Sequence, residues 1–256
     1  MSQTYDVLIR NARIADGTGL PWYRADVGIT GERIAAIGPL SGAEAALTVD
    51  AEERYLTPGF VDAHVHTDLH LLAEPDHPAS VFQGVTSHII GQDGISYAPA
   101  SEENQRRLRH YFAGINGDPA LDFSWRSVAE YLSCFDRTTA LNIAYLLPQG
   151  TIRQEVMGLD PRTPTPEEIG RMQALAVQGM NEGAVGLSTG MDYLPCFYSS
   201  TEELVALCKP VAELGGVYVT HVRPFRGGIA HSVEEVAQIG REAGIPVHVS
   251  HYNGPA

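Results

Sequence analysis

Two patterns of apolar and polar positions divide the chain near residue 58. Residues 1–57 contain short runs in which apolar and polar side chains alternate, such as YDVLIRNARI, separated by Gly and Asp. A period of two is typical of strands joined by hairpins. Over 58–256, short apolar runs alternate with longer segments of helical periodicity. We therefore expect the N-terminal part of a small β-sandwich over 1–57 and an α/β domain over 58–256.

The second part predicts six strands with helices between them. The strands are expected over residues 60–66, 85–91, 140–147, 184–190, 216–222 and 245–251. Thr165, Ser200 and Ser232 are each followed three residues later by Glu, which predicts a capping box at the start of a helix. Gly215 and Gly244 are placed to end helices. Regular alternation of apolar strands and helices predicts a parallel sheet.

A parallel sheet of this kind is either an open, doubly wound sheet or a (β/α)8 barrel. A doubly wound nucleotide-binding sheet carries a Gly-rich phosphate loop after its first strand, whereas this first strand leads into AHVHTD. In a barrel, functional side chains gather at the carboxyl ends of the strands. Polar residues at the ends of several strands favour a metal-dependent TIM-type barrel, with six of its eight strands in this chain.

Histidines stand at the expected carboxyl ends of three strands. His64 and His66 close the first strand, where residues two apart point to the same face. His221 and His251 end the fifth and sixth strands, and Asp93 lies in the GQDG that ends the second. A hydrogen-bonded surface pair would explain His64 and His66 alone, but not four histidines at one end of a barrel. Imidazoles that converge in this way predict a metal site.

Composition narrows the classes of partner. Lys and Arg number 17 against 31 Asp and Glu, a formal net charge of -14 at pH 7, which argues against nucleic acid and anionic membranes. The N-terminal segment has no apolar run long enough for a signal peptide or a membrane span. Three cysteines without CxxC spacing indicate a reducing compartment. We expect a cytoplasmic protein that acts on a small molecule.

Five motifs together resemble the N-acyl-D-amino-acid deacylases (D-aminoacylases) of the amidohydrolase superfamily. They are PGFVDAHVH, GVTSHIIGQDGISYAP, GAVGLSTGMDYLPCFY, VYVTHVRPF and IPVHVSHY, and the resemblance extends over essentially the whole chain. It implies a zinc-dependent hydrolase, with one or two ions, that removes the acyl group from N-acyl-D-amino acids by cleaving a linear amide C–N bond. His64, His66, His221 and His251 match the family's ligand positions, and Asp93 stands where the family typically has a cysteine ligand.

The resemblance also implies roles for polar residues beside the metal. Tyr193 matches a tyrosine near the substrate carbonyl and would be catalytic. Asp192, Arg223 and Asn253 are the candidates for substrate binding. Asn253 stands where the family commonly has a lysine for a substrate carboxylate, and the planar fork of Arg223 would take over that role. The one lysine of the chain, Lys209, lies beyond the end of the fourth strand, so no carboxylated-lysine metal bridge is expected.

A complete (β/α)8 barrel needs two strands more than this chain provides. The resemblance places the catalytic aspartate, the general base, on the eighth strand. We therefore expect a second polypeptide to complete the barrel in a heterodimer, with a truncated chain as the alternative. Two other functions stay open: a cyclic amidase of the same superfamily, and a non-catalytic subunit whose metal holds an interface together.

Overall fold

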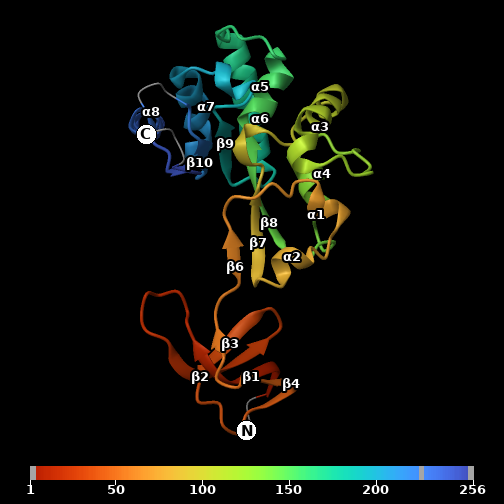
Figure 1. The fold of residues 1–256 in the computed structure, drawn as a ribbon, viewed down its shortest axis with the longest axis vertical. Coiled ribbons are helices and arrows are strands. Elements are labelled where there is room, and N and C mark those ends of the chain that lie inside the picture. The colour runs from red at the N-terminus through yellow and green to blue at the C-terminus, as the bar shows by residue number, and fades with distance from the viewer. Residues whose placement is uncertain (1–3, 225–227, 253–256) are drawn as a thin grey trace. The chain divides into compact units, whose positions relative to one another are not determined.

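The computed structural model describes residues 4–224 and 228–252. Its internal contacts divide the chain into two compact units, Met1–Gly59 and Phe60–Ala256. Each unit has its own sheet (Figure 1). Among the described residues, no helix combines the length and apolar character that crossing a lipid bilayer requires.

The first unit is a mixed five-stranded sheet. Its strands are β1 (Thr4–Ile14), β2 (Tyr23–Thr30), β3 (Arg33–Gly38), β4 (Glu44–Asp50) and β5 (Tyr55–Leu56). They lie in the order β3-β2-β1-β4, and β5 pairs with β1. β2 is antiparallel to both of its neighbours, whereas β4 and β5 run parallel to β1. Ala12, Ile14 and Val27 form the buried core of this unit, so the alternating runs form strands as their period predicts.

The second unit is built on a six-stranded parallel sheet in the order β11-β10-β9-β8-β7-β6. The strands are β6 (Phe60–Asp62), β7 (Val85–Ile90), β8 (Asn142–Pro148), β9 (Gly186–Gly190), β10 (Val217–His221) and β11 (Val247–Val249). Every neighbouring pair is parallel. Because spatial order follows chain order, the sheet is the first six strands of a (β/α)8 barrel. The predicted fold class is confirmed.

The first barrel strand is shorter than the sequence predicts. β6 ends at Asp62 rather than at residue 66, because the Asp62 carboxylate accepts a hydrogen bond of 3.2 Å from the backbone N–H of His64 and the chain leaves the sheet. β11 likewise ends at Val249, two residues before His251. Three of the four histidines therefore lie in the loops that follow the strands, at the same end of the barrel.

Helices cover the sheet (Figure 1). Apolar side chains of the strands and helices form a buried core. The helices are α1 (His70–Ala73), α2 (Pro78–Val81), α3 (Glu102–Asn116), α4 (Val128–Ser133), α5 (Gln149–Met157), α6 (Pro166–Asn181), α7 (Thr201–Glu213) and α8 (Ile229–Ala243), with 3-10 turns η1 (Gln92–Gly94) and η2 (Cys196–Tyr198). α7 packs against both α6 and α8. Leu147, Leu187 and Tyr218 contribute strand side chains to the core, which Met172 and Leu204 cover from the helices.

The helix start signals are correct for two helices of three, and the predicted capping box is complete in one of them. Thr165 closes a full capping box with Glu168 at the start of α6. Ser200 caps α7 by accepting from the backbone N–H of Glu203, but the Glu203 side chain turns inward and leaves the box open. α8 begins at Ile229, so the capping box predicted at Ser232 is wrong and that serine lies inside the helix.

Candidate metal centre

The five side chains predicted as metal ligands come together at the carboxyl ends of the barrel strands. The Nε2 atoms of His64 and His66 lie 3.8 and 3.4 Å from Asp93 Oδ2. The His251 ring lies 4.4 Å from the His64 ring and 4.9 Å from the His221 ring, measured between centroids. Three of these side chains lie especially close together. Each offers one ligand atom, and the three atoms, from His64, Asp93 and His251, lie within 4.8 Å of one another. This spacing suits side chains that surround a cation.

Asp93 is held in this cluster by a tight turn. It lies in η1 with a left-handed backbone, φ 55° and ψ 25°, between Gly91 at φ 76° and Gly94 at φ 72°. A left-handed non-glycine residue costs about 1–2 kcal/mol, and such strain concentrates at functional sites. The turn buries the carboxylate, and Asp93 is only 4% exposed.

Several polar atoms of the cluster lack partners within the protein. Among the described residues, Asp93 Oδ1 and the Nδ1 atoms of His64 and His221 are buried without a hydrogen bond. A buried polar atom without a partner is unfavourable, and a bound cation would satisfy lone pairs of this kind. Imidazole nitrogen and carboxylate oxygen are both ligands of Zn²⁺. The donor set therefore fits a zinc site.

The imidazoles differ in their proton affinity. Burial lowers the pKa of His64 and of His221, and the charge of Asp93 opposes this shift in both. Burial also acts against protonation of His66, but the hydrogen bond and the charge of Asp93, with the charge of Asp68, raise its pKa above the ordinary value. A histidine binds a metal ion as neutral imidazole. The lowered pKa therefore favours the metal-binding form of His64 and of His221.

Tyr193 lies beside the cluster, at the loop that follows β9. Its ring centroid is 5.2 Å from that of His221. Burial, followed by the charge of Asp93, raises the pKa of the Tyr193 phenol, so the hydroxyl keeps its proton at neutral pH. The neighbouring Asp192 is exposed. Asn253 lies outside the described residues.

Arg223 is predicted to bind a substrate carboxylate. It follows β10 and also contacts α8 and the η2 segment. Its Nε lies 3.2 and 3.3 Å from the two carboxylate oxygens of Glu235 in α8. Its Nη1 donates to the carbonyl of Phe197 at 3.0 Å, and its Nη2 to the carbonyl of Ser199 at 2.6 Å. The guanidinium therefore fastens the η2 segment, four to six residues beyond Tyr193, to α8. Its role toward a substrate stays a prediction.

One histidine outside the cluster, His88, and the lysine lie in positions that agree with structural roles. His88 is buried in β7 and hydrogen-bonds to Thr67 at 3.0 Å and Ser80 at 3.1 Å. Lys209 belongs to α7, not to the carboxyl end of β9. The sequence pattern does not single out Asp68 and Gln92, two buried polar residues next to the ligands. Their signal is their position: Asp68 lies two residues after His66, and Gln92 lies directly before Asp93.

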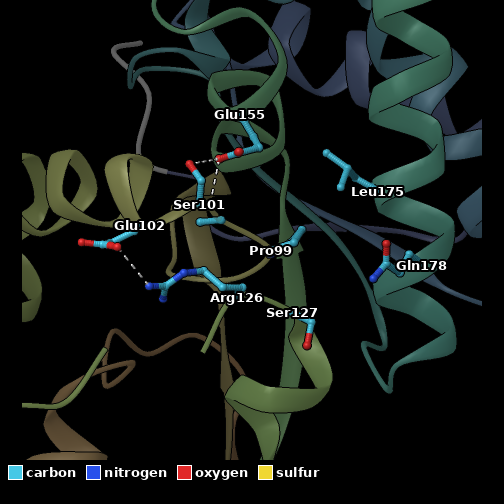
Figure 2. Close-up of a pocket in the computed structure, with 9 residues that line it drawn as sticks. Pro99, Ser101, Glu102, Arg126, Ser127, Glu155, Leu175 and Gln178 are labelled. Atoms are coloured by element: carbon cyan, nitrogen blue, oxygen red, sulfur yellow. Dashed lines mark hydrogen bonds and ion pairs between the residues drawn. The ribbon is translucent and has the colours of Figure 1, made fainter. Parts of the chain in front are cut away.

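A separate hollow of about 440 Å³ lies among α3, α4, α5 and α6 (Figure 2). It is lined by Pro99, Ala100, Ser101, Glu102, Arg126, Ser127, Glu155, Leu175 and Gln178. Its charged groups have local partners: Glu155 accepts from the backbone and hydroxyl of Ser101, both at 3.0 Å, and Arg126 lies 3.7 Å from Glu102. These contacts stabilise the start of α3, and no predicted site residue lines this hollow.

Known proteins resemble this chain in sequence and in fold. Residues 47–255 match the family described as "Amidohydrolase family". The chain is 38% identical to a D-aminoacylase of Alcaligenes xylosoxydans xylosoxydans over 98% of this chain and 51% of that protein. A D-aminoacylase structure described by its binuclear metal centre is 37% identical, with a TM-score of 0.85 over 97% of this chain and 52% of that chain.

A second solved structure carries a ligand that bears on the chemistry. N-acyl-D-glutamate deacylase from Bordetella bronchiseptica, complexed with zinc and a phosphonate inhibitor that mimics the tetrahedral intermediate, is 34% identical with a TM-score of 0.86. The match covers 98% of this chain and 52% of that chain. The chain thus spans about half the length of the relatives that it matches.

Proposed function

The chain belongs to the amidohydrolase family, and on that premise we propose that it carries the metal centre of an N-acyl-D-amino-acid deacylase. The reaction is hydrolysis of the linear amide bond between the acyl group and the amino acid. The observation that carries the proposal is the approach of His64 and His66 to within 4 Å of a buried, strained Asp93, with His251 beside them. The similarity to D-aminoacylase supports the choice of substrate class.

The proposed ligands of one or two zinc ions are His64, His66, Asp93, His221 and His251. When bound, zinc lowers the pKa of a water molecule to about 7 and polarises the acyl carbonyl. The lowered pKa of His64 and His221 keeps a nitrogen lone pair of each available at neutral pH. Asp93 contributes a negative charge in a buried position, where its attraction for a cation is strong. Oxygen is a harder ligand than thiolate, which affects the choice among metals.

Tyr193 is the proposed donor to the carbonyl oxygen as negative charge develops on it. A hydroxyl fixed beside the metal ligands stabilises that charge more than water does, because it needs no reorganisation during the reaction. Asp192, Arg223 and Asn253 are proposed to contact the amino-acid part of the substrate. Arg223 would add the substrate carboxylate to the contacts that it makes with Glu235.

We further propose that additional polypeptide completes the barrel and supplies an aspartate as the general base, as a second subunit in a heterodimer. β6 and β11 each have one neighbour in the described sheet. Phe60 and Val61 on β6 are 55% and 58% exposed, and Val247 on β11 is 40% exposed. Edge strands with apolar side chains are usually covered in native proteins, which supports strands on both sides.

Native mass spectrometry of the protein from its own host tests this proposal first. A complex of this chain with a second polypeptide and one or two zinc ions, active on N-acyl-D-amino acids, is expected. N-acyl-L-amino acids and a cyclic amide serve as control substrates. Ring opening without linear hydrolysis would replace the proposal with a cyclic amidase. Bound zinc without hydrolysis in the complete complex would leave a structural metal site, and absence of bound metal would refute the site itself.

A further inference from the structure

Asp68 lies two residues after His66, on the segment that carries both histidines of the first strand. Its side chain is buried, with the residue 1% exposed. Oδ1 accepts a hydrogen bond from the backbone N–H of Gly91 at 3.2 Å and another from the hydroxyl of Ser96 at 2.5 Å. Gly91 and Ser96 stand on either side of Asp93 in the chain. One carboxylate oxygen thus fastens the histidine segment to both ends of the turn that carries Asp93.

Gln92 makes a second connection between the same two segments. Its side-chain amide donates to the carbonyl of Ala63 at 3.0 Å and to the carbonyl of Ile89 at 2.8 Å. Ala63 directly precedes His64. The histidine pair is therefore tied to the Asp93 turn on both sides, by Ala63 before it and by Asp68 after it.

The core holds both segments in place. The hydroxyl of Thr151 in α5 accepts from the backbone N–H of Ser96 at 3.2 Å and donates to its carbonyl at 2.9 Å. The backbone N–H of Gly94 donates to the Ser188 hydroxyl in β9 at 3.0 Å. On the other segment, the carbonyl of Asp68 accepts from the hydroxyl of Tyr131 in α4 at 2.7 Å. The Asp68 carboxylate thus joins two segments that are each anchored separately.

We propose that Asp68 is a positioning residue of the metal centre, whose carboxylate sets the separation between the His64–His66 pair and Asp93. The proposal rests on the proposed function, because it takes these three side chains as metal ligands. Zn²⁺ requires its nitrogen and oxygen ligands at about 2.0–2.2 Å, within about 0.2 Å. A relative shift of the two segments by even half an ångström would therefore weaken the site. Asp68 acts through Gly91 and Ser96 and need not touch the ion.

Zinc titration by calorimetry and the visible spectrum of bound Co²⁺ test this role in the complete complex isolated from the host. Asp68→Ala removes both acceptor contacts and is expected to weaken zinc binding about 10- to 100-fold, the range for residues that orient ligands, and to change the Co²⁺ bands. Asp68→Asn keeps an Oδ1 that accepts from Gly91 and Ser96, so near-normal affinity and spectrum are expected. Ser96→Ala, a milder change, is expected to weaken binding less in the same direction, and it decides the matter if Asp68→Ala does not fold.

Gln173→Ala is the matched control, because it removes an amide-to-carbonyl contact of 2.8 Å to Ala206 between α6 and α7. It should lower Tm without changing zinc affinity or the Co²⁺ spectrum. Unchanged affinity and spectrum in Asp68→Ala, or in Ser96→Ala, would overturn the positioning role. Equal losses in Asp68→Asn and Asp68→Ala would also overturn it, because the carboxylate charge rather than its contacts would then matter. If the unaltered complex binds no zinc, the proposed function itself fails.

Discussion

Arg153→Met is expected to destabilise the barrel unit strongly, because it breaks a fully buried ion pair. The side chains of Arg153 and Glu203 are 0% and 1% exposed, with 3.2 Å between Nε and Oε1. The guanidinium also donates from Nη1 to the carbonyl of Asp160 at 2.9 Å and from Nη2 to the carbonyl of Arg162 at 2.8 Å. The substitution therefore leaves the buried carboxylate of Glu203 without this partner and removes two hydrogen bonds to backbone carbonyls of the exposed residues Asp160 and Arg162.

The magnitude follows from those lost contacts. Removing one partner of a buried ion pair costs about 3–5 kcal/mol, against a total stability of about 5–15 kcal/mol for a typical protein. With a urea m-value of about 3 kcal/mol/M, the upper end of the usual range, the unfolding midpoint should fall by about 1–2 M. Glu203→Gln removes the negative charge and should recover part of the loss in the double variant with Arg153→Met.

The stability cost of Arg153→Met depends on pH, and the direction of this dependence follows from the pKa of Glu203. Burial raises the pKa of Glu203 above its ordinary value of 4.5, while the hydrogen bond from Ser199 and the charge of Arg153 oppose the shift. The folded carboxyl holds its proton more firmly than the unfolded one, so this group makes stability fall as pH rises from 4.5 through the folded pKa. Arg153→Met removes two opposing interactions, the charge and the hydrogen bond of Arg153, and raises that pKa further.

The loss of stability in Arg153→Met should consequently be smaller at pH 5 than at pH 8. This loss is measured by urea unfolding, followed by circular dichroism, at both pH values. The four proteins compared are the unaltered chain, Arg153→Met, Glu203→Gln and the double variant. A cost below 1 kcal/mol at pH 8, or an equal cost at both pH values, would refute the argument that an uncompensated buried carboxylate carries the effect.

Three other predictions concern the metal centre and the buried thiols. His221→Ala is expected to abolish hydrolysis and to reduce bound zinc, measured by elemental analysis. The control is His248→Ala, at an exposed position on β11, which should leave both unchanged. Normal zinc content in His221→Ala would remove His221 from the ligand set. Asp93→Cys is expected to raise the preference for zinc over Mn²⁺ in competition titrations, because thiolate is the softer ligand, and an unchanged preference would mean that Asp93 does not bind the ion. Burial raises the pKa of Cys196 and Cys208 to about 12. Both thiols should therefore stay unmodified when the native protein is alkylated at pH 8 and then measured by mass spectrometry. Rapid modification would contradict their burial.

The convergence of the candidate ligands could be predicted because it depends on topology alone. In a parallel sheet whose spatial order follows chain order, the carboxyl ends of all strands meet at one edge. The predicted strand order alone therefore places three histidines near one another, namely His64, His221 and His251. Strand ends could not be predicted in the same way, because the first strand stops where the Asp62 side chain bonds to the backbone of His64, a local competition that the apolar pattern does not record.

The two capping boxes that failed have different causes. In α7 the glutamate expected to reach back to the helix start instead pairs with an arginine from elsewhere in the chain, whereas α8 begins three residues before Ser232. Glu203 pairs with Arg153, which lies 50 residues earlier, and Glu235 pairs with Arg223. A charge-assisted contact in the interior outweighs a solvent-exposed capping contact. The sequence contains the competing partners, but their proximity exists only in the folded barrel.

Both of these ion pairs meet at Ser199, six residues after Tyr193. The Ser199 hydroxyl donates to Glu203 at 2.8 Å, and its carbonyl accepts from Arg223 at 2.6 Å. The residues that depart from the local helix rule therefore hold the segment that follows the proposed oxyanion donor. Departures from local sequence rules are expected where a site imposes its own requirements. Arg223 accordingly has a structural role through its contacts with Ser199 and Glu235, and its role toward a substrate carboxylate stays a prediction.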